Sequence, residues 1–388
     1  MNSMVKKESG IITEYYKNYN FGGSLQSFAL QRYAEIITES CDQITYDHEY
    51  KSNIYWLLKG FQSSKGKEKA NTAVYIIKSI VKLLILPVSN MRLIKRKRAI
   101  AVFSKSVPHS VGKYTANKIE KTIDLYVCFI CGSDCVWNMT NNPYCTALGF
   151  VPDGKKKISY APSLGSATIP EGWPEKYLEY VKRLDAVSVR EKSIAEELQA
   201  LIPEKEIFVA ADPTLLFSAE EWQNFLPHRN NEKDYALHYI LSEDMNQMQQ
   251  ALIYTSNCSL KSLTFPNIHN YIYFWQRKYG DIQNYSADPL DFVELIKNAE
   301  VVVTDSFHAV IFSTLFHKPF YALKRETQKD YVGRVENFLE EVGLISQMVS
   351  AEELAALDSV PKIDFSYADK VIAEKREASI KFLKDNLE

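Results

Sequence analysis

The sequence predicts an α/β protein of two domains that face each other across a cleft, with a helix at the C-terminal end. The chain has 388 residues, which is enough for two domains of ordinary size. Short apolar runs typical of strands alternate with helical periodicity along both halves. The first run, 10–16, leads through a glycine-containing loop into a helical pattern, as at the start of nucleotide-binding α/β domains. Together these observations predict parallel sheets joined by right-handed crossovers.

In the N-terminal half, runs typical of buried strands alternate with amphipathic segments. They predict strands at residues 10–16, 125–130, 157–160 and 186–189 and helices at residues 24–38, 175–183 and 193–201. In the first helix, Leu25, Phe28 and Ala29 supply apolar positions at helical spacing.

The same alternation continues in the C-terminal half. It predicts strands at 207–210, 235–241, 260–265 and 300–304, helices at 243–255, 289–298 and 307–316, and a charged amphipathic helix at 367–387. We place the domain boundary in the linker 202–206, which gives domains 1–203 and 204–388. Ligands are expected in the cleft, at the carboxyl ends of the strands.

The composition excludes several classes of protein. Apolar residues make up 46% and charged residues 24% of the chain, which excludes a disordered chain, a collagen and a small disulfide scaffold. The formal net charge of −2 excludes an overall basic footprint for nucleic acid. The first ten residues lack the apolar run of a signal peptide, and the six cysteines match no zinc spacing well. We therefore expect a cytoplasmic protein with free thiols and no metal.

One segment, 65–98, departs from the average charge. It holds ten Lys and Arg residues against one acid, Glu68. Within it, 73–88 is apolar but too short and too rich in lysine to span a bilayer. Lys78 and Lys82 fall on one helix face, as in helices that lie on anionic membrane surfaces. The alternative is a core-facing helix followed by a solvated basic loop.

The motif with the clearest chemistry is Asp305-Ser306-Phe307-His308, directly after a predicted strand. Ser306 is a typical N-cap residue, so His308 falls in the first turn of the next helix. Free N–H groups at such a position favour an anion. A histidine beside a bound anion is suited to general acid catalysis near neutral pH. The alternative is a histidine that only packs at the helix start.

Two more candidates follow predicted strands. Arg190 offers a planar guanidinium group to a carboxylate or a phosphate, or alternatively forms a salt bridge with Glu191. Asp134 could take a proton from a sugar hydroxyl, and Trp137 could stack on the sugar ring. The alternative is that this segment only forms a tight turn, with the Trp137 ring packed in the core.

The loop before the first helix is a weaker candidate. Asn20, Gly22 and Gly23 let the backbone approach a ligand, but the third glycine of a dinucleotide fingerprint is missing. After the His308 helix, Lys324 and Arg334 add positive charge.

Six segments resemble, in order, the polysaccharide pyruvyl transferase family. They are NYNFGGSLQSFALQ, FICGSDCVWN, KISYAPSLGS, DAVSVREKS, VAADPTLL and VVVTDSFHAVIFSTLFHKPFYAL, with GRVENFLEEVGL after them. The resemblance covers most of the chain. Three residues depart from the usual family pattern: Phe21 within the first motif, Cys135 in place of Gln, and Ala309 in place of Gly.

The resemblance implies two Rossmann-like domains arranged as in GT-B glycosyltransferases, with the acceptor on the N-terminal and the donor on the C-terminal domain. It implies transfer of a pyruvyl group from phosphoenolpyruvate, as co-substrate and without a further cofactor, to a sugar, which forms a cyclic ketal. The expected acceptor is a capsule or exopolysaccharide glycan or its lipid-linked precursor. The segment 65–98 would then hold a cytoplasmic enzyme at the inner membrane face.

The resemblance also suggests roles for residues. His308 is the expected catalytic histidine, with Arg190 and Asp134 as further catalytic candidates. The expected donor site comprises Arg190, Ser306, Phe307, His308, Lys324 and Arg334. The expected acceptor site comprises Asn20, Gly22, Gly23, Ser133, Asp134, Trp137 and Ser163.

Two other functions stay open. The same cleft would serve a GT-B glycosyltransferase that uses a nucleotide sugar, or a non-catalytic relative that binds glycan. Binding of nucleotide sugars without binding of phosphoenolpyruvate would favour the glycosyltransferase.

Overall fold

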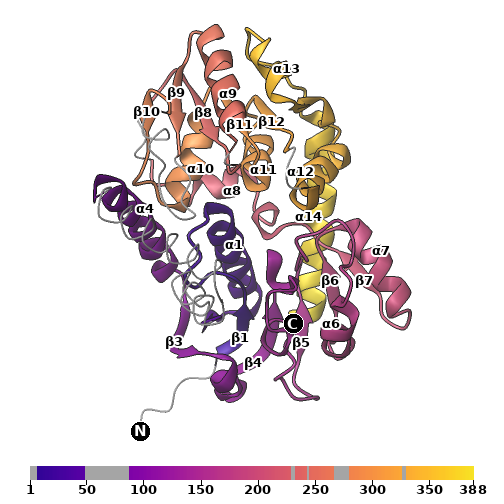
Figure 1. Cartoon of the computed structure of the whole chain (residues 1–388). Coiled ribbons are helices and arrows are strands. Elements are labelled where there is room, and N and C mark those ends of the chain that lie inside the picture. The colour runs from indigo at the N-terminus through magenta and orange to yellow at the C-terminus, as the bar shows by residue number, and fades with distance from the viewer. Residues whose placement is uncertain (1–6, 49–86, 229–231, 243, 266–278, 326–328) are drawn as a thin grey trace, which may run out of the picture.

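The computed structural model describes residues 7–48, 87–228, 232–242, 244–265, 279–325 and 329–388 (Figure 1). These residues form two groups of parallel strands with helices packed around them. The predicted alternation of strands and helices is therefore present in both halves.

The N-terminal sheet has the strand order β3-β2-β1-β4-β5, and all neighbouring strands are parallel. Its strands are β1 (Lys7–Ile12), β2 (Cys41–Tyr46), β3 (His109–Tyr114), β4 (Tyr126–Cys131) and β5 (Lys157–Ser159). A parallel pair, β6 (Val187–Val189) and β7 (Ile207–Val209), lies beside β5, joined to it by a bridge between Ile158 and Ala186. The helical segments of this half are α1 (Phe21–Thr38), α4 (Pro87–Ser106), η1 (Ala116–Leu125), η2 (Cys135–Trp137), α5 (Pro143–Thr146), α6 (Trp173–Lys182) and α7 (Lys192–Leu201).

The C-terminal sheet has the order β10-β9-β8-β11-β12-β13 and is also parallel. Its strands are β8 (Tyr235–Tyr239), β9 (Lys261–Thr264), β10 (Ile282–Gln283), β11 (Val301–Thr304), β12 (Phe320–Leu323) and β13 (Met348–Val349). The helical segments that follow β7 are η3 (Pro213–Leu215), α8 (Ala219–Gln223), α9 (Met245–Asn257), α10 (Pro289–Asn298), α11 (Phe307–Leu315), α12 (Lys329–Glu341), η5 (Ile345–Gln347), α13 (Ala351–Ala355) and α14 (Ser366–Leu387).

The division at residues 203 and 204 stays a prediction, but two features of the chain bear on it. Strand β7 pairs with β6, so the chain leaves the first group of strands after Val209 rather than at residue 203. Helix α14 returns to the N-terminal half, where Phe382 stacks on Phe208 with ring centroids 4.9 Å apart. The Ser379 hydroxyl also accepts a hydrogen bond from the Ala211 N–H.

Helix α1 begins three residues earlier than predicted. The Oδ1 atom of Asn20, its N-cap, accepts hydrogen bonds from the N–H groups of Gly22 at 2.8 Å and Gly23 at 3.5 Å. The two glycines therefore belong to the first helical turn, because the cap satisfies the donors that this turn leaves unpaired.

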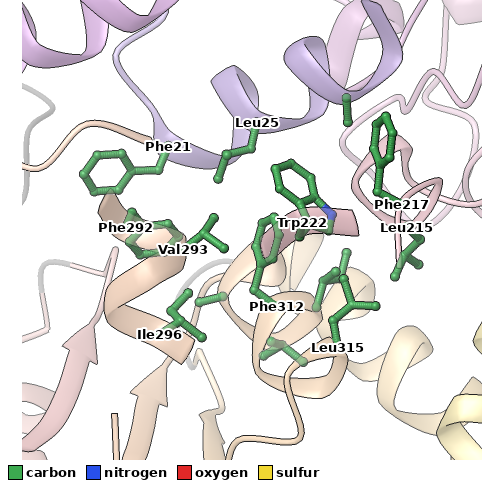
Figure 2. Packing of buried hydrophobic residues seen from close by; sticks show 14 of the residues in the cluster. Phe21, Leu25, Leu215, Phe217, Trp222, Phe292, Val293, Ile296, Phe312 and Leu315 are labelled. Atoms are coloured by element: carbon green, nitrogen blue, oxygen red, sulfur yellow. The ribbon is translucent and has the colours of Figure 1, made fainter. Parts of the chain in front are cut away.

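Aromatic side chains pack helix α1 against the C-terminal half (Figure 2). Phe21 stacks on Phe292 of α10 with ring centroids 4.6 Å apart. Trp222 of α8 packs edge-on against Phe312 of α11 at 5.0 Å. Figure 2 places Trp222 between Leu25 and Phe312. This apolar contact fixes the two sheets relative to each other, and so fixes the loops that meet beside it.

Part of the basic segment is helical. Residues 65–86, with Lys78 and Lys82, lie outside the described residues, but 87–98 belongs to α4. The helix buries Arg96, whose Nη2 donates to the Asn284 carbonyl at 2.6 Å, so α4 also contacts the C-terminal half. The alternative of a basic loop after residue 88 is therefore wrong. No helix in the described ranges is long and apolar enough to cross a membrane.

Candidate active site

The candidate site lies where loops from both sheets meet. Asp134 follows β4, Arg190 follows β6, and Asp212 follows β7. His308 stands in the first turn of α11, directly after β11. These four side chains come from the carboxyl ends of parallel strands, where α/β proteins place their ligands.

His308 is buried between the two halves. Its Nε2 atom lies 3.5 Å from Oδ2 of Asp212. The other side of its ring lies against Gly22, where an added Cβ atom would stand 2.1 Å from Nδ1. Only glycine allows this approach, so Gly22 in the first family motif makes room for the His308 ring in the last one.

Arg190 forms the centre of a buried ion-pair network. Its Nη1 lies 3.0 Å from Oδ2 of Asp212, and its Nε lies 3.2 Å from Oε1 of Glu191. The Ser163 hydroxyl donates to the same Glu191 oxygen at 2.6 Å. The guanidinium carbon lies 5.0 Å from the centroid of the Phe307 ring. The alternative of a salt bridge to Glu191 is therefore confirmed. Arg190 also lines the pocket described below, and its contact with a bound anion stays a prediction.

Electrostatics keep this network charged. Burial would raise the pKa of Asp212, but His308 and Arg190 hold it well below its usual range. Burial would likewise lower the pKa of Arg190, but Glu191, Asp212 and Asp134 raise it above its ordinary value. The Nη2 atom of Arg190 has no hydrogen-bond partner among the described residues, although it is buried. A buried charged donor of this kind favours an anionic ligand.

A second arginine approaches the same carboxylate. Oδ1 of Asp134 lies 3.9 Å from Nη1 of Arg190 and 3.8 Å from Nη1 of Arg334. Arg334 stands on α12, so the pair of arginines joins the two halves of the protein. The neighbouring thiol of Cys135 lies 3.6 Å from Nη1 of Arg334. Burial raises the pKa of Cys135 to about 12, which favours the neutral thiol over the nucleophilic thiolate.

Glu14, which the sequence does not single out, interacts electrostatically with Asp134 and is a further candidate residue. The predicted strand 10–16 included it, whereas β1 ends at Ile12 and leaves Glu14 at the carboxyl edge of the sheet. Its Oε1 accepts a hydrogen bond from Asn141 at 2.7 Å. Burial, and then the negative charge of Asp134, raise the pKa of Glu14 to about 7.

A pocket of about 850 Å³ opens beside these residues. Arg190 and Asp212 line it from the N-terminal half, and Phe307 and Arg334 line it from the C-terminal half. Among the described residues, no group of three His, Cys, Asp or Glu side chains is arranged to hold a metal ion.

The start of α11 adds backbone donors to the site. Ser306 is the N-cap, but its side chain makes no capping hydrogen bond. The Asp305 carboxylate is occupied within the protein, because it accepts hydrogen bonds from the N–H groups of Leu241 and Ser242 and from Arg325 Nε. The first turn of α11 therefore keeps the N–H groups and the positive dipole end that attract anions.

The predicted site residues separate into two groups. Those that the structure brings together are Asn20, Gly22, Gly23, Asp134, Ser163, Arg190, Ser306, Phe307, His308 and Arg334. In this group Asn20 caps α1, and Gly23 lies in the first turn of that helix. Ser163 contacts Arg190 only indirectly, because its hydroxyl donates to Glu191.

Three predicted residues lie elsewhere. Trp137 is fully buried, packs against Trp173 at 5.9 Å and donates its indole N–H to a backbone carbonyl, so it offers no face to a sugar. Ser133 is also fully buried and donates to the Ala161 carbonyl. Lys324 is exposed at the end of β12 and does not line the pocket. The sequence pattern placed these residues near strand ends but could not show on which side of the loop each one lies.

This fold defines a GT-B-type α/β protein, and the candidate site lies between its two sheets. The chain belongs to the polysaccharide pyruvyl transferase family, whose family model matches residues 20–327. The resemblance seen in the sequence motifs is thereby confirmed, and so is the predicted fold class.

Solved structures of similar fold are found at low sequence identity. Arabidopsis thaliana UGT89C1, complexed with UDP-L-rhamnose, has a TM-score of 0.52 and 10% identity, over 98% of this chain and 96% of that chain. The UDP-GlcNAc 2-epimerase of Methanocaldococcus jannaschii has a TM-score of 0.48 and 11% identity, over 98% of this chain and 100% of that chain. No curated protein matches the sequence. At these identities the structural likeness concerns the fold alone.

Proposed function

We propose that the protein transfers the pyruvyl group of phosphoenolpyruvate to two hydroxyl groups of a sugar, forming a cyclic ketal and releasing phosphate. The observation that carries the proposal is the buried Arg190 Nη2, which lacks a hydrogen-bond partner in the described part of the chain. Arg190 lines the same pocket as Phe307, the first residue of α11. A donor with both a carboxylate and a phosphate fits a site with two guanidinium groups and helix N–H donors.

The reaction balances without a further reactant. The methylene carbon of phosphoenolpyruvate takes a proton and becomes a methyl group. The neighbouring carbon forms two C–O bonds to the sugar oxygens, and its bond to the phosphate oxygen breaks. The two hydroxyl protons end on the methyl carbon and on the released phosphate. A residue that donates a proton and a residue that accepts one would complete this scheme.

We assign the proton donor to His308 and the acceptor to Glu14. His308 lies between Asp212 and Gly22, which limit the positions open to its ring. Glu14 lies next to Asp134, and a pKa of about 7 lets it take up a proton near neutral pH. Asp134 is the base expected from the sequence, but it faces two arginines and is better suited to hold them in place. Positively charged groups fixed before the reaction would supply most of the rate acceleration.

We also propose that the acceptor is presented at an anionic membrane surface, in a glycan or its lipid-linked precursor. Support comes from one face of α4, where exposed Met91, Ile94 and Val102 alternate with exposed basic residues. Apolar side chains among cations are typical of helices that lie at a membrane interface. Binding to anionic vesicles that weakens with salt is the expected result, and absence of binding at low salt would contradict the proposal.

Calorimetric titration of phosphoenolpyruvate tests the donor. We expect saturable binding to the wild-type protein and no comparable binding of nucleotide sugars. Binding of a nucleotide sugar without binding of phosphoenolpyruvate would instead favour a GT-B glycosyltransferase, whose fold this chain shares.

A further inference from the structure

A second pocket, of about 390 Å³, lies on the N-terminal half. It is bounded by the loop after β1, the edge of β2 and β3, and helix α4. The residues that give it its chemistry are Tyr16, Lys17, Tyr19, Lys105, His109 and Lys113. We call it the tyrosine–lysine pocket. None of the site residues discussed above lines it.

The charged side chains that line this pocket in the described structure are all cations. Lys17 Nζ and Lys113 Nζ lie 5.2 and 5.4 Å from the centroid of the Tyr16 ring. Such cation–π contacts hold an ammonium group in place without neutralising its charge. Lys17 also forms an ion pair with Asp47 at 2.6 Å, whereas Lys105 and Lys113 form no ion pair within the described ranges. The pocket is therefore positively charged.

One loop connects this pocket to the candidate active site. Glu14 and Asn20 stand at its two ends, and the segment 15–19 between them lines the tyrosine–lysine pocket. Asn18 holds the turn, because its side chain donates to the Glu14 carbonyl and accepts from the Asn20 N–H. One short loop therefore links the two sites, and it is the segment that a glycan bound at both would have to pass.

We propose that the tyrosine–lysine pocket binds an acidic sugar unit of the acceptor, one that bears a phosphate or a carboxylate. Tyrosine rings suit the C–H faces of a sugar, and the lysines suit its acidic group. This inference rests on the proposed function, since it places a neighbouring unit of the same acceptor. The same cations suit a phosphate ester and a uronic acid, so both are tested.

The test uses NMR titration of the full-length protein with glucose 1-phosphate, glucuronate and glucose, each first without phosphoenolpyruvate and then with phosphoenolpyruvate at saturation. We expect one or both acidic sugars to bind and neutral glucose to bind more weakly. In Lys113→Gln the affinity for the acidic sugar should fall about fivefold, and Lys113→Arg should restore it. The matched control is Lys121→Gln, a substitution on η1 outside the pocket, which should bind like the wild type.

Three results would overturn the inference. They are binding of neither acidic sugar, unchanged affinity in Lys113→Gln, and loss of binding when phosphoenolpyruvate is added, which would place the sugar in the donor site. Titration of phosphoenolpyruvate into Lys113→Gln separates this inference from the proposed function. Unchanged donor binding is expected there, whereas failure of the wild type to bind phosphoenolpyruvate would contradict the proposed function and not the pocket.

Discussion

Two helix starts meet at the candidate site, and they differ in what their backbone donors do. At α1, Asn20 accepts hydrogen bonds from the N–H groups of Gly22 and Gly23. At α11, the side chain of Ser306 makes no such bond. The N–H groups at the glycine-containing start therefore have a side-chain acceptor, while those at the α11 start have none from the N-cap residue and would be open to a ligand. A glycine pair after a strand is often interpreted as a cradle for phosphate. Here its clearest role is to make room for His308.

Removing His308 should have the largest effect on the reaction. We expect His308→Ala to lower the transfer rate by about 10³-fold or more, because no other imidazole stands in the described site. The affinity for phosphoenolpyruvate should stay largely intact. The measurement is the release of phosphate in the presence of an acceptor, together with calorimetry of the donor. Unchanged turnover would remove His308 from the mechanism.

Removing the positive charge of Arg190, which lies beside the start of α11, should have the second-largest effect. Arg190→Ala should weaken binding of phosphoenolpyruvate by roughly 500-fold, because it removes a buried guanidinium and leaves Asp212 and Glu191 unneutralised. Calorimetry measures the binding, and a thermal melt shows whether the variant folds. Lys192→Ala, on the exposed rim of the same pocket, is the control and should bind within about twofold of the wild type.

Glu14 should make the transfer activity depend on pH. If Glu14 accepts the proton, activity should rise with pH through about 7, and Glu14→Gln should lower it about 100-fold above that pH and remove the rise.

The same group affects stability in the opposite direction. Folding raises the pKa of Glu14 from 4.5 to about 7, so its contribution to stability is present below about pH 4.5 and is lost as pH rises through 7. Thermal melts across this range should show the loss in the wild type and a smaller one in Glu14→Gln. Identical pH profiles for the two proteins would rule out this role.

A substitution of Gly22 shows whether the first family motif affects the reaction by positioning His308. Gly22→Ala should displace the His308 ring and lower the transfer rate between tenfold and 100-fold. The double variant Gly22→Ala/His308→Ala should be no slower than His308→Ala alone. A further loss in the double variant would mean that Gly22 contributes independently, for example by contacting the acceptor.

The smallest effect is expected at the α1 cap. Asn20→Ala should lower the free energy of unfolding by about 1 kcal/mol, because the N–H groups of Gly22 and Gly23 lose their acceptor. Ser306→Ala removes no capping bond and should cost less. Chemical denaturation of both variants makes this comparison, and an equal loss in the two would contradict the difference between the helix starts.

The sequence predicted the parts of this site that depend on local pattern. His308, Arg190 and Asp134 each follow an apolar strand within a few residues, so their position at the sheet edge follows from periodicity alone. Asp212 lay in a quoted motif, but its role depends on two partners distant in the chain. The predicted strand 10–16 includes Glu14, whereas β1 ends at Ile12, so the sequence gives no reason to place Glu14 at the sheet edge. The role of Asp212 and the end of the first strand both depend on contacts with distant parts of the chain, which a local sequence pattern does not contain.

The elements of the fold divide in the same way. Strand β11, which is buried throughout, and strand β4, which is buried except at Val127, form continuous apolar runs that the sequence reveals. Strand β3 is half-exposed, contains Gly112 and Lys113, and gives no such signal. Trp137 shows the limit for single residues, because an indole in a loop has the same local pattern whether it faces a sugar or the core.

The position of the bound donor tests the central claim most directly. A crystal structure of the protein soaked with phosphoenolpyruvate should place one of its anionic groups within hydrogen-bond distance of Arg190 Nη2 and the other at the first turn of α11, beside His308. Density for the donor at the start of α1, or no contact with Arg190, would contradict the assignment of the anion site to the uncapped helix start.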